Sequence, residues 1–333
     1  MTIPKRWLIT GGCGFIGTNL VRNLVSKGKY FIRIVDNLSV GTREDLAKVC
    51  KFSEKQKVKS EKTSSILPQV ELIIGDILDE QFAIKMIQGV DVIVHLAAGT
   101  GVGPSVENPR RDMEVNAIGT FNMLEAARHR NVKKFVFASS GAPLGEAKPP
   151  MHEELAPHPI SPYGASKLAG EAYCSVYYRT FGIETTTLRF GNVYGPRSGH
   201  KNSVVAKFIR QAIYGETLEI YGDGKQARDF IYIDDLIQTI LLAATREGIG
   251  GETFQIATNT ETTVSELVDT LLPILANSGF NDINVRHCKP RLGDVRRNFS
   301  DTSKAQKMLG WKARVDLSDG LRRTVEWFTK DWK

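Results

Sequence analysis

The sequence holds little cysteine and no long apolar run. Its four cysteines are scattered through 333 residues, with no C-x-x-C pair and no H-E-x-x-H motif. This spacing indicates neither a disulfide framework nor a zinc or other metal site, and it is typical of the reducing cytoplasm. No apolar stretch approaches the roughly 20 residues of a membrane helix, and the N-terminus leads straight into a predicted strand. We therefore expect a cytoplasmic protein without a signal peptide or a membrane partner.

Acidic residues are outnumbered by basic ones. There are 37 against 44, a net charge of +7, while the 41% hydrophobic fraction is ordinary for a globular protein. Such a surplus suits a polyanionic ligand such as a nucleotide diphosphate. Much of it lies in residues 48–62, a lysine-rich stretch without regular period or interleaved aromatic residues. We interpret this stretch as a solvated insertion and expect no nucleic-acid partner, an RNA-binding arm being the alternative.

Strand-like and helix-like segments alternate along the first 190 residues. The strands are nearly all apolar, which is expected when helices cover both faces of a parallel sheet. The sequence therefore predicts an α/β fold with a doubly wound parallel sheet. Predicted strands are 7–10, 31–36, 70–76, 91–98, 134–140 and 184–190, and predicted helices are 80–88, 110–130 and 162–181.

The alternation changes after about residue 190. Loops lengthen, strands shorten, and helices predicted at 204–214, 264–276 and 317–328 no longer alternate cleanly with strands. We predict a first domain over residues 1–190, to which 228–257 returns, and a smaller α/β C-terminal substrate lobe over 191–333. Ligands of open α/β sheets bind at the carboxyl ends of the strands, where this lobe would close.

A glycine-rich turn follows the first predicted strand. Gly11, Gly14 and Gly17 stand at three-residue spacing where this strand leads into a helix predicted at 15–26, an arrangement that points backbone N–H groups at a pyrophosphate. Nineteen residues after Gly17, Asp36 ends the second strand, where a carboxylate accepts hydrogen bonds from an adenosine ribose and repels a 2′-phosphate. The pattern predicts a Rossmann-type site for NAD rather than NADP, although Arg43 could soften that repulsion.

Tyr163, Lys167 and Ser140 form the sharpest chemical pattern. Tyr163 and Lys167 stand four apart on a predicted helix, so both side chains project from one face. A neighbouring ammonium and a charged nicotinamide ring would both favour the phenolate and so lower the tyrosine pKa. Ser140 ends a predicted strand, where its hydroxyl can bond the same substrate oxygen. The set suits proton removal from a secondary alcohol while its hydride leaves; a surface Tyr-Lys pair is the alternative.

Further motifs stand in order over nearly the whole chain. They include TGGCGFIG, HLAA, VNAIGT, SPYGASKLAGE, RFGNVYGPR, IYGDGKQARDFIYIDDL and RLGD. Together they resemble the extended short-chain dehydrogenase/reductases, specifically the UDP-galactose 4-epimerase-like, nucleotide-sugar epimerase/dehydratase branch. The run is highly specific for the family and much less so for the substrate.

The resemblance implies an NAD site, a nucleotide-sugar site and a catalytic set. The catalytic residues would be Ser140, Tyr163 and Lys167. Those implied to hold NAD are Gly11, Gly14, Phe15, Ile16, Gly17, Asp36, Asn37, Asp76, Ile77, Leu96, Ala97, Ala98, Asn116, Tyr163 and Lys167. Those implied to hold the substrate are Ser140, Asn192, Val205, Tyr221, Arg228, Arg291, Asp294 and Asn298. Surface ion pairs are the alternative for Arg228 and Arg291, and for His95 we favour a structural role at a turn.

The residues after Ser140 favour one reaction of this branch. Its dehydratases carry an Asp-Glu pair directly after the catalytic hydroxyl and its decarboxylases a nearby glutamate, whereas Gly141 and Ala142 stand here. One acid/base group and a returning hydride suffice for 4-epimerisation through a transient 4-keto sugar. The resemblance therefore implies an NAD-dependent 4-epimerase of a UDP-linked hexose such as UDP-glucose or UDP-galactose.

Two details concern the hexose. Pro143 and Leu144 replace the family's usual aromatic beside the sugar, and Gly191 is smaller than the usual residue before Asn192, which would widen the pocket. Asn298 occupies a position that resembles the gate for C2 substituents, and its intermediate size leads to the hypothesis that 2-acetamido sugars fit.

Two other functions remain open. One is a dehydratase or reductase acting on a CDP- or dTDP-linked sugar, and the other a non-catalytic nucleotide- or RNA-binding member of the fold. A homodimer is implied by the resemblance, because the family pairs the helices that correspond to 110–130 and 162–181 in a four-helix bundle. Here they carry extra apolar and aromatic residues, among them Tyr173, Val176 and Tyr177.

Overall fold

The computed structural model describes residues 5–55, 69–290 and 295–332. The chain forms two compact units, each assembled from separate segments. The first unit comprises Met1–Gly145, Pro157–Arg189 and Ile237–Phe254. The second comprises Glu146–Ala156, Phe190–Leu236 and Gln255–Lys333. The segment that returns to the first unit is thus shorter than residues 228–257, and residues 146–156 group with the second unit.

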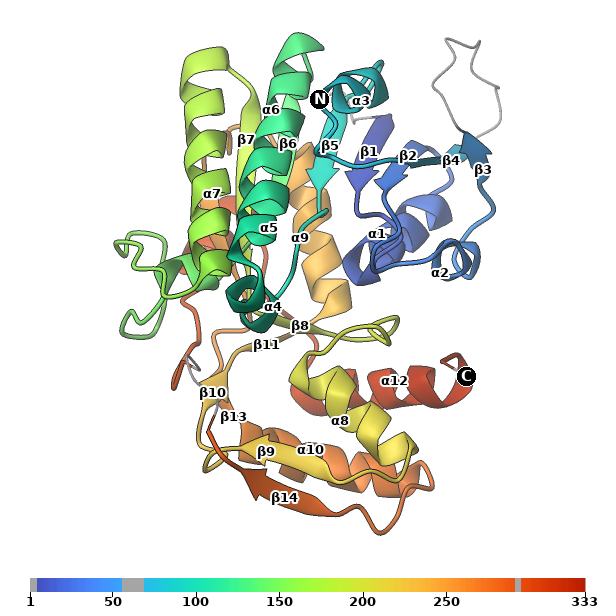
Figure 1. The fold of residues 1–333 in the computed structure, drawn as a ribbon, viewed down its shortest axis with the longest axis vertical. Coiled ribbons are helices and arrows are strands. Elements are labelled where there is room, and N and C mark those ends of the chain that lie inside the picture. The colour runs from blue at the N-terminus through green and yellow to red at the C-terminus, as the bar shows by residue number, and fades with distance from the viewer. Residues whose placement is uncertain (1–4, 56–68, 291–294, 333) are drawn as a thin grey trace. The chain divides into compact units, whose positions relative to one another are not determined.

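An eight-stranded sheet forms the centre of the first unit (Figure 1). Its strand order is β12-β7-β6-β5-β1-β2-β4-β3, with β1 paired in parallel to β2 on one side and to β5 on the other. The order proceeds outward from β1 in both directions, which confirms the predicted doubly wound sheet. The strands are β1 (Arg6–Thr10), β2 (Phe31–Asp36), β3 (Ser53–Lys55), β4 (Gln69–Ile74), β5 (Val92–His95), β6 (Lys134–Ser140), β7 (Glu184–Phe190) and β12 (Thr253–Ile256).

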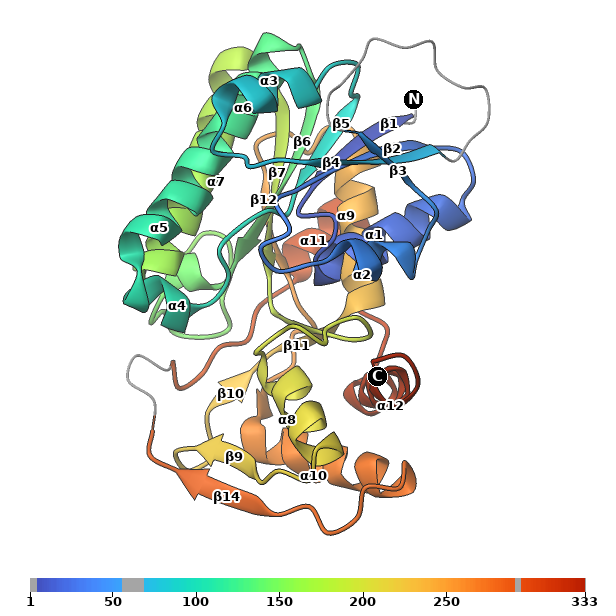
Figure 2. The same cartoon turned by 45° about the vertical axis from the view of Figure 1, so that its right-hand side comes forward.

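Helices cover both faces of this sheet. Figure 2 shows α3, α6 and α7 on one face and α1 and α9 on the other. Strand residues such as Leu8, Ile93 and Phe135 are therefore fully buried, as their apolar sequences predict. The helices are α1 (Phe15–Ser26), α2 (Arg43–Ala47), α3 (Glu80–Met86), α4 (Val102–Glu107), α5 (Pro109–Met113), α6 (Gly119–His129), α7 (Pro162–Phe181) and α9 (Ile233–Thr245), with a 3₁₀ turn at Ala142–Leu144.

The sequence-based prediction differs from the structure most clearly in three segments. The helix predicted over 110–130 is α5 and α6 joined by the π-helical turn Glu114–Ile118. The strand predicted over 91–98 stops at His95, so residues 96–98 lie in a loop. Within 48–62, residues 53–55 add β3 to the sheet edge, and residues 56–62 lie outside the described ranges.

Short strand pairs and helices make up the second unit. Strand β8 (Asn192–Tyr194) pairs with β11 (Phe230–Tyr232), β9 (Leu218–Tyr221) with β14 (Val285–Cys288), and β10 (Ala227–Arg228) with β13 (Thr262–Thr263). Its helices are α8 (Val204–Ile213), α10 (Val264–Asn277), α11 (Ser303–Leu309) and α12 (Leu317–Lys330).

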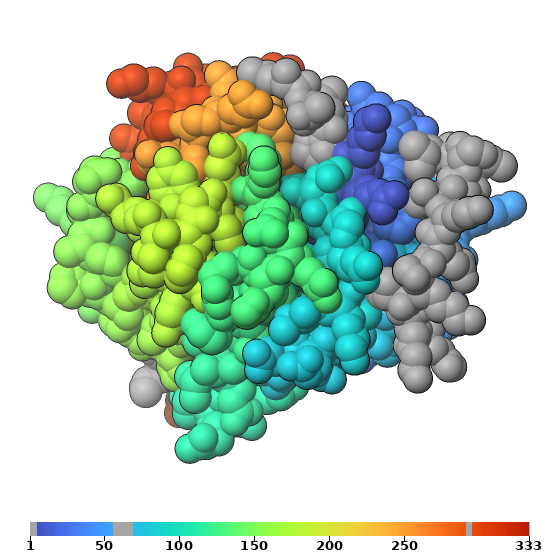
Figure 3. All heavy atoms as spheres, turned by 90° about the horizontal axis from the view of Figure 1, so that it is seen from above, coloured from blue at the N-terminus to red at the C-terminus, as the bar shows by residue number. Residues whose placement is uncertain are grey.

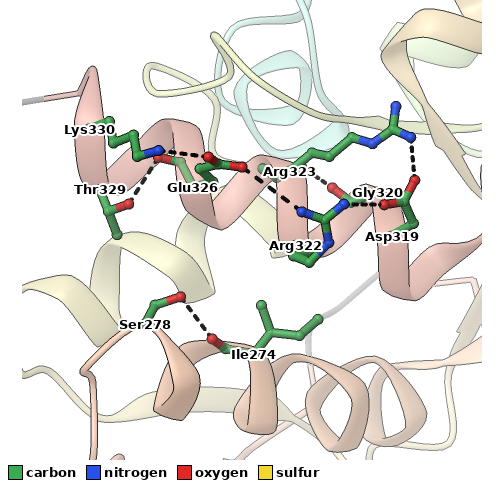
Figure 4. Close-up of polar contacts among 10 residues, drawn as sticks. Ile274, Ser278, Asp319, Gly320, Arg322, Arg323, Glu326, Thr329 and Lys330 are labelled. Atoms are coloured by element: carbon green, nitrogen blue, oxygen red, sulfur yellow. Dashed lines mark hydrogen bonds and ion pairs between the residues drawn. The ribbon is translucent and has the colours of Figure 1, made fainter.

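Helix α12 is amphipathic, with a buried apolar face and an exposed charged face. Leu321, Val325 and Phe328 are buried. Figure 4 shows ion pairs along the charged face, where Asp319 bonds Arg322 and Arg323. In the described part of the chain, no helix is both long and apolar enough to cross a membrane.

Candidate active site

The glycine turn between β1 and α1 is built for close backbone approach. Gly11 has a φ of +68°, and a Cβ there would lie 2.9 Å from the backbone nitrogen of Ala97. A Cβ on Gly17 would lie 2.4 Å from the carbonyl oxygen of Gly11. Helix α1 is capped by Gly14, which has no side chain, and its first turn carries no acidic residue. Its first N–H groups are thus available to an anion such as a pyrophosphate.

The Asp36 carboxylate is fixed beside this turn. Its Oδ2 accepts a hydrogen bond from the backbone N–H of Cys13 at 2.9 Å, and its Oδ1 accepts one from Leu38 at 2.8 Å. Burial raises the pKa of Asp36, and these hydrogen bonds act against that rise. Each carboxylate oxygen has a second lone pair, so both can still accept bonds from ribose hydroxyls. The glycine turn and Asp36 together fit the dinucleotide that the sequence predicts.

Other predicted cofactor residues follow β2, β4 and β5 or begin α1. Asn37 donates to Asp76 at 3.1 Å. Ile77 is buried in the core, where a Cβ on Gly119 would lie 2.5 Å from its Cδ1. Phe15 and Ile16 begin α1, and Leu96, Ala97 and Ala98 follow β5, so these predicted residues border the same turn through Gly11 and Ala97.

Ser140, Tyr163 and Lys167 come together in the first unit. Ser140 ends β6, and its hydroxyl is hydrogen-bonded to the phenol of Tyr163, on the first turn of α7. The Lys167 Nζ donates to the carbonyl oxygen of Ala138 at 2.8 Å and lies 6.0 Å from the centre of the Tyr163 ring. This arrangement places a proton acceptor, a hydroxyl donor and a cation at the carboxyl end of β6.

The electrostatic state of the phenol differs from the sequence-based expectation. Burial raises the pKa of Tyr163 to about 12; the Ser140 hydrogen bond lowers it, and the charge of Asp112 raises it further. The expected lowering therefore needs a positive charge in addition to Lys167, because desolvation of the phenolate dominates here. A positively charged nicotinamide ring would supply that charge when bound.

A buried network that the sequence did not reveal supports the catalytic helix. The Asp112 carboxylate accepts hydrogen bonds from Ser166 Oγ at 2.6 Å and from Asn116 Nδ2 at 2.9 Å. Asn116 also exchanges hydrogen bonds with the backbone N–H and carbonyl of Gly99. Ser166 Oγ lies 3.1 Å from the carbonyl oxygen of Tyr163. The Asn116 amide, predicted to contact the cofactor, is thus engaged by protein groups.

His95 lies in a second network with a definite proton arrangement. Thr10 Oγ1 accepts the backbone N–H groups of Leu96 and Ala97, each at 3.2 Å. Both of its lone pairs are then used, so its hydrogen points to His95 Nδ1 at 2.8 Å. Burial and the charge of Lys167 lower the pKa of His95 to about 3. The imidazole is therefore neutral with its hydrogen on Nε2.

This tautomer extends the network to the π-helical turn. His95 Nε2 donates to Thr120 Oγ1 at 3.1 Å, and Thr120 donates to the carbonyl oxygen of Asn116 at 2.6 Å. The chain of hydrogen bonds ties the end of β1, which leads into the glycine turn, to the residue that holds Gly99. A structural role for His95 agrees with this geometry.

A buried ion pair lies behind the catalytic strand. Glu171 stands two helical turns after Tyr163 on α7, and its carboxylate accepts both Nε and Nη2 of Arg189, at 2.9 and 2.6 Å. Ser139 Oγ donates to the same carboxylate at 2.5 Å. The pair therefore joins α7 and β7 to the residue next to Ser140. The spacing of Tyr163, Lys167 and Glu171 at four-residue intervals was a sequence signal for this role.

The predicted substrate residues within the described ranges all lie in the second unit, apart from Ser140. Asn192 is exposed and opposite Phe230 in the β8–β11 pair. Arg228 donates from Nη1 to the carbonyl oxygens of Ala227 at 2.8 Å and Val295 at 2.6 Å. The half-buried Asn298 donates its backbone N–H to Ala227. These three residues thus gather around β10 and β11.

Two more of these residues lie on neighbouring elements. Val205 is buried in α8, and the Tyr221 hydroxyl on β9 is 3.3 Å from Lys207 Nζ of the same helix. Tyr221 is linked to the β10 region because Gln226 donates to its carbonyl oxygen at 2.7 Å. The predicted residues Arg291 and Asp294 lie outside the described residues.

Known proteins resemble this chain in both sequence and structure. The family model "NAD dependent epimerase/dehydratase family" matches residues 7–257. A UDP-glucose 4-epimerase of Mycolicibacterium smegmatis is 35% identical over 328 residues, 97% of this chain and 98% of its own. The structure of a Thermotoga maritima UDP-glucose 4-epimerase with UDP-glucose superposes with a TM-score of 0.87 at 37% identity, covering 98% of this chain and 100% of that one.

The structure is also similar to that of an enzyme named for a different reaction, a dehydration. The structure of a dTDP-glucose 4,6-dehydratase from Streptomyces venezuelae with NAD bound superposes with a TM-score of 0.85 at 31% identity, covering 98% of this chain and 97% of that one. The chain is thus similar over almost its full length to several nucleotide-sugar enzymes. The matched family model includes both the glycine turn and Tyr163. The chain belongs to the NAD-dependent epimerase/dehydratase family of nucleotide-sugar enzymes.

Proposed function

We propose that this protein is a 4-epimerase of a UDP-linked hexose, interconverting UDP-glucose and UDP-galactose. The observation that carries the proposal is the Ser140–Tyr163 hydrogen bond, with Lys167 behind it, in a site whose next residues are Gly141 and Ala142. That segment offers one acid/base group and no carboxyl group. Elimination of water from the sugar would need a further acid and base, whereas epimerisation needs neither.

Each residue of the set has a role in the two half-reactions. NAD bound at the glycine turn would supply hydride-transfer chemistry at C4, with the hydride returned to the other face of the sugar. Tyr163 takes the proton of the 4-hydroxyl in the first half-reaction and gives it back in the second. Ser140 donates a hydrogen bond to the same oxygen, and Lys167 stabilises the phenolate through its charge. The proton and the hydride both return, so no group is consumed.

The similarity to UDP-glucose 4-epimerases supports the nucleotide and the reaction. The dTDP-glucose 4,6-dehydratase relative makes elimination the alternative to test. Incubating the purified protein with UDP-, dTDP- and CDP-hexoses and reading the C4 configuration by NMR separates the two. We expect a mixture of C4 epimers from UDP-glucose; a 4-keto-6-deoxy product, or turnover of dTDP- or CDP-sugars alone, would contradict the proposal.

Tyr163→Phe tests the assigned base directly. Loss of a general base lowers turnover by about 10²- to 10⁴-fold, and the variant keeps the ring that packs in the site. Tyr214→Phe serves as a matched control, because Tyr214 is an exposed tyrosine of the second unit. Equal turnover of the two variants would remove Tyr163 from the mechanism.

The proposal extends to the sugar and to the assembly. Asn298, half-buried beside Ala227, is small enough to admit a 2-acetamido group, so we expect UDP-GlcNAc turnover; its complete absence would end this part of the proposal. We also propose a homodimer through α6 and α7, which adjoin on one side of the first unit (Figure 3). Ile118, Tyr173, Val176 and Phe181 are each more than two-fifths exposed there.

A further inference from the structure

Arg43 lies close to the turn that holds Asp36. It is the first residue of α2, which Thr42 caps through hydrogen bonds shared with Asp45. Two residues earlier, Gly41 passes so near the turn that a Cβ on it would lie 2.2 Å from the carbonyl oxygen of Cys13. The N–H of that same Cys13 donates to Asp36. The backbone of Arg43 therefore lies close to the part of the turn where Asp36 would bind the adenosine ribose.

Electrostatics agree with this position. Burial foremost, and then the charge of Asp36, raise the pKa of the Cys13 thiol, whereas the charge of Arg43 lowers it. Arg43 and Asp36 thus act on the same point of the turn with opposite signs. A free guanidinium here would attract a ribose 2′-phosphate, the group that Asp36 repels.

Glu54 holds that guanidinium in a two-pronged ion pair. Arg43 Nε donates to one carboxylate oxygen at 2.8 Å and Nη2 donates to the other at 3.2 Å. The pair raises the pKa of Arg43 and lowers that of Glu54. This fork-to-fork geometry occupies the same donors that would bind a phosphate.

The strand that carries Glu54 is fixed in the sheet. Strand β3 pairs in parallel with β4, with Glu54 opposite Leu72. The next residue, Lys55, bonds the buried Glu71 at 3.0 Å, and Glu71 in turn bonds the buried Arg33. Because Glu54 and Lys55 are consecutive strand residues, their side chains project to opposite faces. Lys55 thus anchors the strand while Glu54 faces α2.

We propose that Glu54 enforces the preference for NAD over NADP by engaging Arg43 and keeping the charge beside the adenosine ribose negative. Asp36 alone would leave this cation able to neutralise a 2′-phosphate. With Glu54 in place, an incoming 2′-phosphate meets two carboxylates and a guanidinium that is already bound. The inference concerns the cofactor site and is independent of the nucleotide sugar and of the reaction.

The test measures cofactor binding by calorimetry rather than turnover, on wild type, Glu54→Gln and Glu44→Gln. Glu44 lies on the same short helix and is exposed, so its variant matches the loss of charge without freeing Arg43. We expect Glu54→Gln to bind NADP+ about fivefold more tightly at low salt, the upper range for one exposed pair, with NAD+ affinity unchanged. Added salt should reduce the gain.

Two further variants test whether the gain in NADP+ affinity comes from Arg43. In Glu54→Gln/Arg43→Ala the gain should disappear, since no guanidinium remains to meet the phosphate. Arg43→Ala alone should bind NADP+ no more tightly than wild type does, because it frees no guanidinium and leaves the Glu54 carboxylate unpaired. The proposal is overturned if Glu54→Gln and Glu44→Gln bind NADP+ equally, if the gain survives in the double variant, or if Arg43→Ala alone strengthens NADP+ binding.

Discussion

At the scale of single residues, the burial of Tyr163 favours the protonated form of its phenol. Burial and the charge of Asp112 both raise its pKa, and Ser140 is the neighbour that lowers it. The site therefore holds a weak acid whose ionisation depends on a cation arriving with the cofactor. Such dependence couples proton removal to the presence of an oxidised nicotinamide.

Replacing Asp112 with asparagine should move the pH dependence of turnover. Removing the carboxylate's charge lowers the Tyr163 pKa, so the base form becomes available at lower pH and the acid limb of kcat/KM shifts downward. A pH profile of kcat/KM for wild type and Asp112→Asn checks the sign. Ser166→Ala, which removes a bond to Asp112 but not its charge, is the control; a similar shift in both variants would contradict a charge effect.

His95 should make the protein sensitive to acid. Its folded pKa of about 3 lies below the ordinary 6.5, so the unfolded state binds the proton first as pH falls. The free energy of unfolding then declines below pH 6.5, by up to about 1.4 kcal/mol per pH unit from this residue, until pH approaches 3. Urea unfolding from pH 7 to 4 should show a shallower decline in His95→Asn. A His95 imidazole NMR signal, assigned by its loss in His95→Asn, that protonates near pH 6.5 in the folded wild type would contradict the assignment.

At the scale of elements, the sequence predicted the sheet and its helices well but not their local irregularities. Apolar runs and the glycine turn located the main strands and α1, because such patterns follow directly from burial and backbone sterics. Over five residues, the π-helical turn Glu114–Ile118 cannot be distinguished from an α-helix by its apolar pattern. Asn116, within this turn, bonds Gly99 and Asp112, and such tertiary contacts are not visible in the local sequence.

The candidate site was predictable to a similar extent. Ser140 and Tyr163 were located by strand end and helix spacing, and the structure brings them into contact. Asp112 and Ser166 were missed because their bond joins residues 54 positions apart. Strand β3 was missed because three polar residues in a lysine-rich stretch acquire strand structure only by pairing with β4.

The Glu171–Arg189 pair should be costly to break and much less costly to replace as a whole. Glu171→Ala leaves a buried guanidinium whose Nη1 already has no hydrogen-bond partner, and we expect a loss of about 3–5 kcal/mol. Glu171→Met/Arg189→Met removes both charges and should lose less than the sum of the single variants. Urea unfolding of the three variants measures this. Additive losses would mean that the two side chains do not act as a pair.

At the scale of the whole molecule, the exposed apolar face of α6 and α7 predicts the oligomeric state. Phe121 and Tyr173 pack at 5.2 Å between ring centres across the two helices, so the face is preformed. Val176→Glu should place a charge at its centre and yield monomers in sedimentation velocity. Tyr214→Glu, at an exposed apolar residue of the second unit, should leave the assembly unchanged; a wild-type monomer, or a Val176→Glu dimer, would contradict the prediction.

The interleaved chain has a consequence for protein engineering. The polypeptide leaves the first unit after Gly145, re-enters at Pro157, leaves after Arg189 and returns from Ile237 to Phe254. A single-crossover gene fusion at any point therefore cuts through at least one of the units. Recombining the nucleotide-binding half of this protein with the sugar-recognition half of a relative requires grafts at five matched junctions, with β12 supplied intact to close the sheet edge beside β7.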